Sequence, residues 1–442
     1  MSLKRKLWSM AWPATVEMQA GEVAKVATLI LVGNLGPAAT AGVGLTHQML
    51  FFISMLVMGI SVGTVAMVSQ AYGVGNGKDV AGSAMQGWMA ATVIGAVVSI
   101  LMVTGGGTAL RLLGAKPDVI EAAFWYTRWI GLSAILQAWF MVQVASIRAT
   151  GNTLLPLKLH LVGQVVHLLA VLVLVRGWGP IPAMGVVGAG IAHFLGQLTN
   201  TLLMHRAWVR LLVHEYGYTL WQLIRPDPNI IRRLLRVGGP AMAERMVMAS
   251  GHMIFVRTVA GLGTEIYASH QILLTVNNLI WTFTHGYAIA VTVMVGQLLG
   301  AGRPLEADQT ARQGAWLSTG LVSVLSIGLM SVAHQVAGVF SLDPDVATMA
   351  AWVMPLILIF QAPQAVYSCI NGALQGAGDT QFTLVAAIIG VWVVRNPLML
   401  LSTYTFHWGL FGAWAIMALD FWMRGGLAYW RFARGDWQRL RV

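Results

Sequence analysis

Long apolar stretches recur from one end of the chain to the other, separated by short polar segments. Each stretch holds roughly 20 to 28 residues, and a helix of about 20 residues crosses the hydrocarbon core of a bilayer. The stretches are continuous rather than alternating between apolar and polar positions, so the pattern favours helices over a membrane β-barrel. Twelve spans are predicted, at residues 12–35, 45–70, 82–106, 119–146, 156–176, 184–205, 237–262, 270–297, 312–336, 346–373, 380–404 and 408–431.

The second half of the chain repeats the first in one constant register. PATVE at Pro13 matches PAMAE at Pro240, QAYGVG at Gln70 matches QLLGAG at Gln297, and the Gly151 of ATGNT matches the Gly378 of GAGDT, always at the same separation. Each copy holds six spans, an even number, so both copies enter the membrane with the same orientation. We therefore expect an all-α membrane protein of two six-helix bundles related by a parallel pseudo-two-fold repeat.

The predicted domains are an N-terminal bundle at 1–206, a polar cytoplasmic connector at 207–236 and a C-terminal bundle at 237–442. Two bundles that face each other across an axis leave a cleft between them. This architecture is typical of secondary transporters, whose substrate sites lie near the membrane midplane and which work by rocking one bundle against the other.

Composition agrees with a membrane protein, because 57% of the residues are hydrophobic, 10% are charged and the mean hydropathy is +0.70. The formal net charge is +11, and the basic residues concentrate in segments that the twelve-span topology places on one side, such as SLKRK at the start and the stretch 206–236. The positive-inside rule makes that side cytoplasmic, with both termini. The excess of basic residues then reflects topology and contact with anionic membrane lipid, and no nucleic-acid partner is expected.

Motifs of catalysis do not occur in the sequence. There is no phosphate-binding loop of the G-x-x-x-x-G-K-[ST] type, no H-E-x-x-H, no C-x-x-C and no nucleophile elbow. We expect no enzymatic activity, no cofactor and no metal site. Energy for transport must then come from an ion gradient or from a partner.

Acidic residues inside the spans are the strongest functional signal, because an ionised side chain costs about 2.5–3.5 kcal/mol at the centre of a membrane helix. Glu17 and Glu244 hold equivalent positions of the repeat, each four residues after a proline. We expect them, with Glu22 and Lys25, to form an ion-coupling or substrate site in the cleft, where a proton and a cationic substrate compete.

Structural interpretations of the same residues stay open. Glu22 and Lys25 are three residues apart on a helix and can pair with each other. Glu17 can pair with an interfacial arginine, and Glu244 with Arg245 or with a neighbouring helix.

The C-terminal half holds a second set of charged residues. Asp420 and Arg424 are four residues apart on the last span, and Arg395 can reach an acid elsewhere in this half, so we expect ion pairs that fix the bundle. Further polar residues of the spans are candidates for lining a cavity, namely His167, His252, Asn277, Asn278, Gln361 and Asn371. His167 and His252 are also candidate proton relays, although a hydrogen-bonded contact between helices is the simpler interpretation.

The blocks WPATVE…LVGNLGPAATAGVGLTHQ, MVSQAYGVGNGKDV, RATGNTLLP, GPAMAE…VAGLGTEIYASHQI, VGQLLGAGRPLEAD, LQGAGDTQFTL and GAWAIMALDFWMRGG resemble the multidrug and toxic compound extrusion family. They extend over nearly the whole chain and are most similar to the bacterial DinF-like branch. The resemblance implies a V-shaped, twelve-helix exporter of small organic compounds in the bacterial cytoplasmic (inner) membrane, coupled to H⁺ or Na⁺. We expect the protein to be a monomer.

The sequence also departs from this family. Many members have an aspartate where this chain has Thr28, and an asparagine and an aspartate where it has His167 and Val171. The carboxylate site that those relatives use in the N-terminal half therefore does not carry over. Because a dehydrated Na⁺ needs several oxygen ligands, these losses favour H⁺. A flippase for lipid-linked precursors and a membrane protein that has lost transport are the alternative functions.

Overall fold

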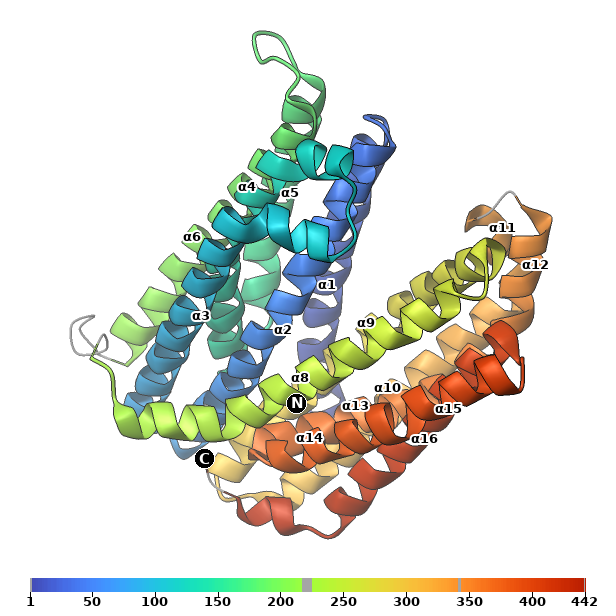
Figure 1. Cartoon of the computed structure of the whole chain (residues 1–442). Coiled ribbons are helices and arrows are strands. Elements are labelled where there is room, and N and C mark those ends of the chain that lie inside the picture. The colour runs from blue at the N-terminus through green and yellow to red at the C-terminus, as the bar shows by residue number, and fades with distance from the viewer. Residues whose placement is uncertain (1, 217–224, 341–342, 441) are drawn as a thin grey trace. The chain divides into compact units, whose positions relative to one another are not determined.

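We describe a computed structural model of the chain, which covers residues 2–216, 225–340, 343–440 and 442. Helices account for nearly all of these residues (Figure 1), and β-structure among them is limited to an isolated bridge between Trp178 and Ile181. The predicted all-α class is confirmed. The first half forms α1 (Leu3–Gly33), α2 (Pro37–Val74), α3 (Gly77–Leu112), α4 (Pro117–Ala149), α5 (Leu154–Arg176), α6 (Gly185–Arg210) and the π-helix η1 (Leu211–Glu215).

The second half has the same order of long helices, with more interruptions. It forms α8 (Pro228–Ala260), α9 (Thr264–Gly300), α10 (Pro304–Ser331), α11 (Ala333–Phe340), α12 (Pro344–Val353), α13 (Pro355–Ala377), α14 (Thr380–Ile388), the π-helix η2 (Ile389–Arg395), α15 (Asn396–Leu400), the π-helix η3 (Leu401–Thr405), α16 (Gly409–Ala433) and the short 3₁₀-helix η4 (Asp436–Arg439). Part of the predicted connector, residues 217–224, lies outside the described residues.

Within the described ranges, eight helical segments are long and apolar enough to cross a membrane, and a bent pair made of Pro344–Ile357 and Ile359–Ala377 is a ninth. The other long helices are α1, α8 and α16, which carry charged residues along their length. Together these segments make the twelve membrane helices predicted from the sequence.

The chain separates into two compact units. The N-terminal unit is Val16–Met242, and the C-terminal unit consists of Met1–Thr15 together with Ala243–Val442. The two dividing points lie inside α1 and α8, in each case shortly after a proline within the helix, Pro13 or Pro240. A proline removes one hydrogen bond of the helix and loosens the turn before it. The predicted domain boundaries at 206 and 237 stay a prediction.

Each unit is organised around one central segment. In the N-terminal unit α4 packs against α2, α3 and α6, and in the C-terminal unit α13 packs against α9, α10 and α16. The α4 segment is continuous, whereas its counterpart in the repeat, α12 and α13, is bent by 48°. The bend lies between Ile357 and Ile359, shortly after Pro355, which is the first residue of α13.

The internal repeat is visible in the backbone. Gly36 and Gly263 precede α2 and α9 with φ angles of 112° and 123°, and Gly151 and Gly378 follow α4 and α13 with φ angles of 94° and 90°. A side chain strongly disfavours such positive φ angles, so glycine is needed at each of these turns. The matched glycines therefore mark turns that are built in the same way in both halves.

Helix α5 has one exposed apolar face. Its exposed apolar residues Leu161, Val165, Leu169 and Leu172 follow one another at intervals of three and four residues. This spacing lines up one face of a helix. An apolar and exposed face of this kind is what a helix presents to hydrocarbon tails, whereas the opposite face of α5 is buried and includes His167.

Candidate ion-coupling site

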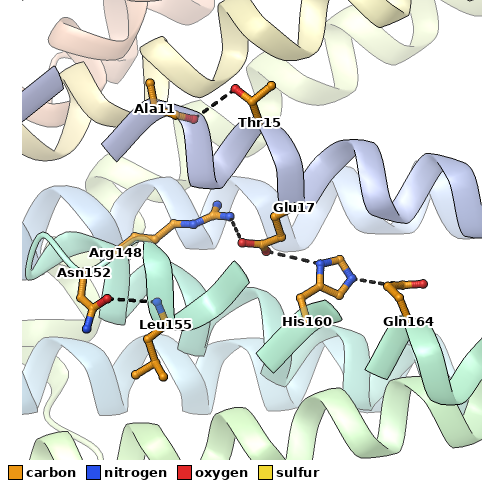
Figure 2. Close-up of polar contacts among 8 residues, drawn as sticks. All are labelled: Ala11, Thr15, Glu17, Arg148, Asn152, Leu155, His160 and Gln164. Carbon is orange, nitrogen blue, oxygen red and sulfur yellow. Dashed lines mark hydrogen bonds and ion pairs between the residues drawn. The ribbon is translucent and has the colours of Figure 1, made fainter. Parts of the chain in front are cut away.

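Glu17 lies on α1 within the N-terminal unit and is almost fully buried, with 5% of its surface exposed. Its Oε2 accepts a hydrogen bond and ion pair from Nη2 of Arg148 at 2.6 Å, and its Oε1 lies 3.7 Å from Nδ1 of His160. Figure 2 shows the Glu17 carboxylate between these two side chains, with Gln164 bonded to the far side of the imidazole at 2.5 Å. The carboxylate therefore has a permanent positive partner.

Glu244 lies on α8 within the C-terminal unit and is 2% exposed. Three neutral side chains donate hydrogen bonds to its carboxylate, Asn371 Nδ2 at 3.1 Å, Gln375 Nε2 at 3.1 Å and Thr383 Oγ1 at 2.7 Å. The alternative pair with Arg245 is not among the ion pairs of the described residues. Neutral donors stabilise a carboxylate but leave its charge uncancelled.

The partners of the two glutamates are themselves related by the repeat. Arg148 and Gln375 hold equivalent positions, and each lies 131 residues after the glutamate to which it donates. The same position thus supplies a charged donor in one half and a neutral donor in the other. Removing a carboxylate from water is costly unless a counter-charge is present, and among the ion pairs of the described residues Glu17 has such a counter-charge whereas Glu244 does not.

Glu22 and Lys25, the other candidates of the first helix, form an ion pair at 2.8 Å. Their side chains are 56% and 49% exposed. The pair is therefore local, as the spacing of three residues predicts, and the structure does not bring it into contact with Glu17 or Arg148 among the hydrogen bonds of the described residues.

The charged residues of the C-terminal half form a buried cluster of their own. Arg424 binds both carboxylate oxygens of Asp420, with Nε at 2.7 Å and Nη2 at 2.6 Å, and both residues are 0% exposed. Arg395 reaches the same carboxylate at 3.5 Å. The Arg424 guanidinium also lies over the rings of Tyr367 and Phe421, at 4.8 and 4.7 Å from their centroids. Two arginines thus share one acid inside this unit.

The polar residues predicted to line a cavity have different surroundings. Gln361 donates to Asn277 Oδ1 at 2.9 Å inside the C-terminal unit, and Asn371 belongs to the Glu244 site. His252 and Asn278 are exposed. His167 is 8% exposed, and its Nε2 lies 3.0 Å from Thr28 Oγ1.

Across the described ranges, no group of three or more His, Cys, Asp and Glu side chains is placed to hold a metal ion. The carboxylate oxygens of Glu244 face one O–H and two N–H donors.

Sequence reasoning missed the partners that distinguish the two glutamates. Arg148 stands three residues before Gly151, and Gln375 stands three residues before Gly378, in the motifs RATGNT and QGAGDT that define the repeat. Aligning the two copies position by position shows this change from arginine to glutamine. Thr383 and His160 have no such signal, because their repeat counterparts are Pro156 and Ala387.

A family model described as MatE matches residues 13–173 and 240–401 of the chain. The two matched segments begin at the equivalent prolines of the internal repeat, Pro13 and Pro240. Among curated proteins, the "Probable multidrug resistance protein NorM" of Thermotoga maritima is 25% identical over 440 residues, which cover 100% of this chain and 94% of that protein. The "Multidrug resistance protein PmpM" of Pseudomonas aeruginosa is 25% identical over 403 residues, covering 89% of this chain and 83% of its own.

Solved structures share the fold over the full length. A MOP superfamily transporter from Pyrococcus furiosus superposes with a TM-score of 0.89 at 19% identity, covering 100% of this chain and 98% of that one. An outward-facing multidrug resistance MATE transporter of the same superfamily gives a TM-score of 0.88 at 19% identity, with coverage of 99% and 97%.

Proposed function

The chain belongs to the MatE family, and from this premise we propose that it is a proton-coupled antiporter that exports amphipathic organic cations. Transport would proceed by alternating access, with the protein in the bacterial cytoplasmic membrane and both termini in the cytoplasm. The curated relatives named as multidrug resistance proteins support the export of organic compounds. The coupling ion and its carrier are argued from this chain's own residues.

The observation that carries the proposal is the environment of Glu244. A buried carboxylate with three neutral donors, and with no cationic partner among the ion pairs of the described residues, is costly when it is ionised. Binding a proton or an organic cation removes that cost. Because one carboxylate cannot do both at once, arrival of either ligand favours release of the other, which is the exchange that an antiporter needs.

A proton suits this site better than Na⁺ does. Asn371 Oδ1 is buried and has no hydrogen-bond partner in the described part of the chain. A half-turn of the Asn371 amide exchanges its NH₂ group for its oxygen, so the same side chain can donate to a charged Glu244 and accept from a protonated one. A dehydrated Na⁺ needs several oxygen ligands at once, whereas the donors around Glu244 present hydrogens.

Glu17 has a different role in this proposal. Arg148 already neutralises it at 2.6 Å, so neither a proton nor a cationic substrate gains by binding there. We assign the Glu17–Arg148 pair to fixing α1 against α4, and Glu244 to ion coupling.

The flippase alternative requires transfer of a lipid across the membrane. Transfer of labelled lipid in proteoliposomes that contain the purified protein tests it.

The test is transport by purified protein in proteoliposomes. Uptake of ethidium, a fluorescent organic cation, is followed under an imposed pH gradient and, separately, under a Na⁺ gradient at equal pH. We expect uptake with the pH gradient alone. Uptake that follows only the Na⁺ gradient would remove the proton from the mechanism, and no uptake with either would remove antiport.

The matched variants are Glu244→Gln and Glu306→Gln. Both substitutions remove one carboxylate, but Glu306 is half exposed and paired with Arg303 at the start of α10. We expect Glu244→Gln to lower uptake driven by the pH gradient at least tenfold, and Glu306→Gln to stay within twofold of the wild type. Equal rates in both variants would exclude Glu244 as the carrier.

A further inference from the structure

Three histidines from three different helices meet inside the N-terminal unit. They are His47 of α2, His167 of α5 and His193 of α6. The ring of His193 lies between the other two, with its centroid 6.2 Å from that of His47 and 5.8 Å from that of His167. Both contacts are edge to face, with interplanar angles of 81° and 86°. The three imidazoles therefore form one continuous row.

His167 has hydrogen-bond acceptors that suit a charged imidazolium. Its Nε2 lies 3.0 Å from Thr28 Oγ1, and the Thr28 hydroxyl donates its own proton to the carbonyl of Ala24 at 2.9 Å. Thr28 therefore accepts from His167. The His167 ring also forms a hydrogen bond with the backbone of Ala192. Ala192 lies in the interior of α6, where its N–H is bonded within the helix, so its carbonyl oxygen is the atom that accepts from His167.

The rings of His47 and His193 have fewer hydrogen-bond partners than His167 among the described residues. His47 Nε2 lies 3.0 Å from the hydroxyl of Tyr126 on α4, and His193 Nε2 is buried with no partner among the residues that the structure describes. The charged groups that act on the row come from α1, where Lys25 and Glu22 interact with His47. These two are paired with each other at 2.8 Å, so their opposite charges largely cancel at the row.

We propose that His47, His167 and His193 form a second proton-binding site, which takes up one proton, held on His167, and exchanges it during transport. This inference rests on the proposed antiport and extends it to the N-terminal half, where Arg148 neutralises Glu17. The row holds a single proton because a second imidazolium would lie about 6 Å from the first and be repelled by it. Imidazole is the side chain that ordinarily changes charge between pH 5 and 8.

The direct test is the titration of the histidines in the full-length protein, labelled with ¹³C at Cε1 and reconstituted in lipid nanodiscs. Spectra of His47→Gln, His167→Gln and His193→Gln assign the three signals. We expect the His167 signal of the wild type to titrate between pH 5 and 8. We also expect the titration midpoint of His47 or His193 to rise by half a unit or more in His167→Gln, because the repelling charge is gone.

Transport supplies the second readout. Uptake of ethidium under a pH gradient is expected to fall at least fivefold in His167→Gln, which keeps a donor to Thr28 but cannot titrate. The control is His334→Gln, which removes an exposed histidine of α11 and is expected to stay within twofold of the wild type. His193→Gln gives the same comparison should His167→Gln fail to fold.

The two proposals fail in different ways. If no signal of the row changes between pH 5 and 8 in the wild type, the proton site is wrong even where the protein transports ethidium. If the His167 signal does titrate between pH 5 and 8 but His167→Gln and His193→Gln transport ethidium at the wild-type rate, the row binds a proton that has no part in transport. That result also overturns the proposal. If the wild type shows no uptake driven by a pH gradient, the proposed antiport fails, and the exchange of this proton during transport fails with it.

Discussion

Arg148 and Gln375 occupy the same position in the two halves of the chain, and each donates to the glutamate that lies 131 residues before it. Arg148 approaches Glu17 to 2.6 Å and carries a charge, whereas Gln375 approaches Glu244 to 3.1 Å and is neutral. One difference in side-chain charge between repeat partners thus separates a carboxylate in an ion pair from a carboxylate held by neutral donors.

Gln375→Arg should abolish ion coupling at Glu244. The new guanidinium would pair with Glu244 as Arg148 pairs with Glu17, so the carboxylate would no longer need a proton or a cation. We expect ethidium uptake under a pH gradient to fall at least tenfold in proteoliposomes. Gln375→Met is the matched control, since it changes the same position without adding charge, and it should keep more than a third of the rate. Full transport by Gln375→Arg would contradict the role assigned to the missing counter-charge.

Glu17 and Arg148 should stabilise the folded protein only when both side chains are present. We expect Glu17→Gln and Arg148→Gln each to lower the free energy of unfolding by about 3–5 kcal/mol, because each leaves a mostly buried charge without its partner. The double variant should lose less than the sum of the two. Titration with SDS in mixed micelles measures these values. Lys25→Gln, which breaks the exposed pair with Glu22, should cost less than about 1 kcal/mol. Additive losses would rule out direct coupling.

Asp420 should be more important for stability than an acid in a surface pair. Asp420→Asn leaves Arg424 and Arg395 buried without a carboxylate, and we expect a loss of about 3–5 kcal/mol in the free energy of unfolding. Asp308→Asn breaks the exposed pair with Arg312 on α10 and should cost about 1 kcal/mol or less. The same SDS titration compares the two. Similar losses would show that burial of the cluster contributes little.

Close packing of α3 against α4 can be tested at two glycines. A Cβ at Gly131 would lie 2.8 Å from Met102 Cβ and 3.1 Å from the backbone nitrogen of Val103, whereas a Cβ at Gly105 would meet nothing within 4 Å. We expect Gly131→Ala to destabilise the protein by about 1–3 kcal/mol through overpacking. Gly105→Ala should be neutral or stabilise by up to about 1 kcal/mol, because alanine favours helix. Thermal unfolding in detergent gives the order, and the reverse order would contradict this packing.

The predicted membrane orientation can be checked at two exposed lysines. Lys78 and Lys116 begin or precede α3 and α4, and the basic-residue pattern places Lys78 in the cytoplasm and Lys116 on the opposite side. A membrane-impermeant maleimide added to intact cells should label Lys116→Cys and not Lys78→Cys. The native Cys369 is buried, so the wild type should remain unlabelled. Labelling of Lys78→Cys alone would invert the topology.

Local properties of this protein could be predicted from the sequence. The length and continuity of the apolar stretches predicted the helices, the recurrence of motifs in one register predicted the duplication, and glycines such as Gly36 and Gly263 marked its turns. Pairs within one helix were predictable as well, since Glu22 with Lys25 and Asp420 with Arg424 are three or four residues apart. Helix geometry alone brings such residues together.

The tertiary structure decided which residues meet across helices. Arg148 is far from Glu17 along the chain, and the three histidines of the row come from α2, α5 and α6, so their contacts depend on how the helices pack and rotate against one another. The sequence showed Glu17 and Glu244 as equal partners of a repeat. Only packing revealed that one is neutralised by an arginine while the other is held by neutral donors, because the charge state that a buried carboxylate can adopt depends on its spatial neighbours and not on its own position in the chain.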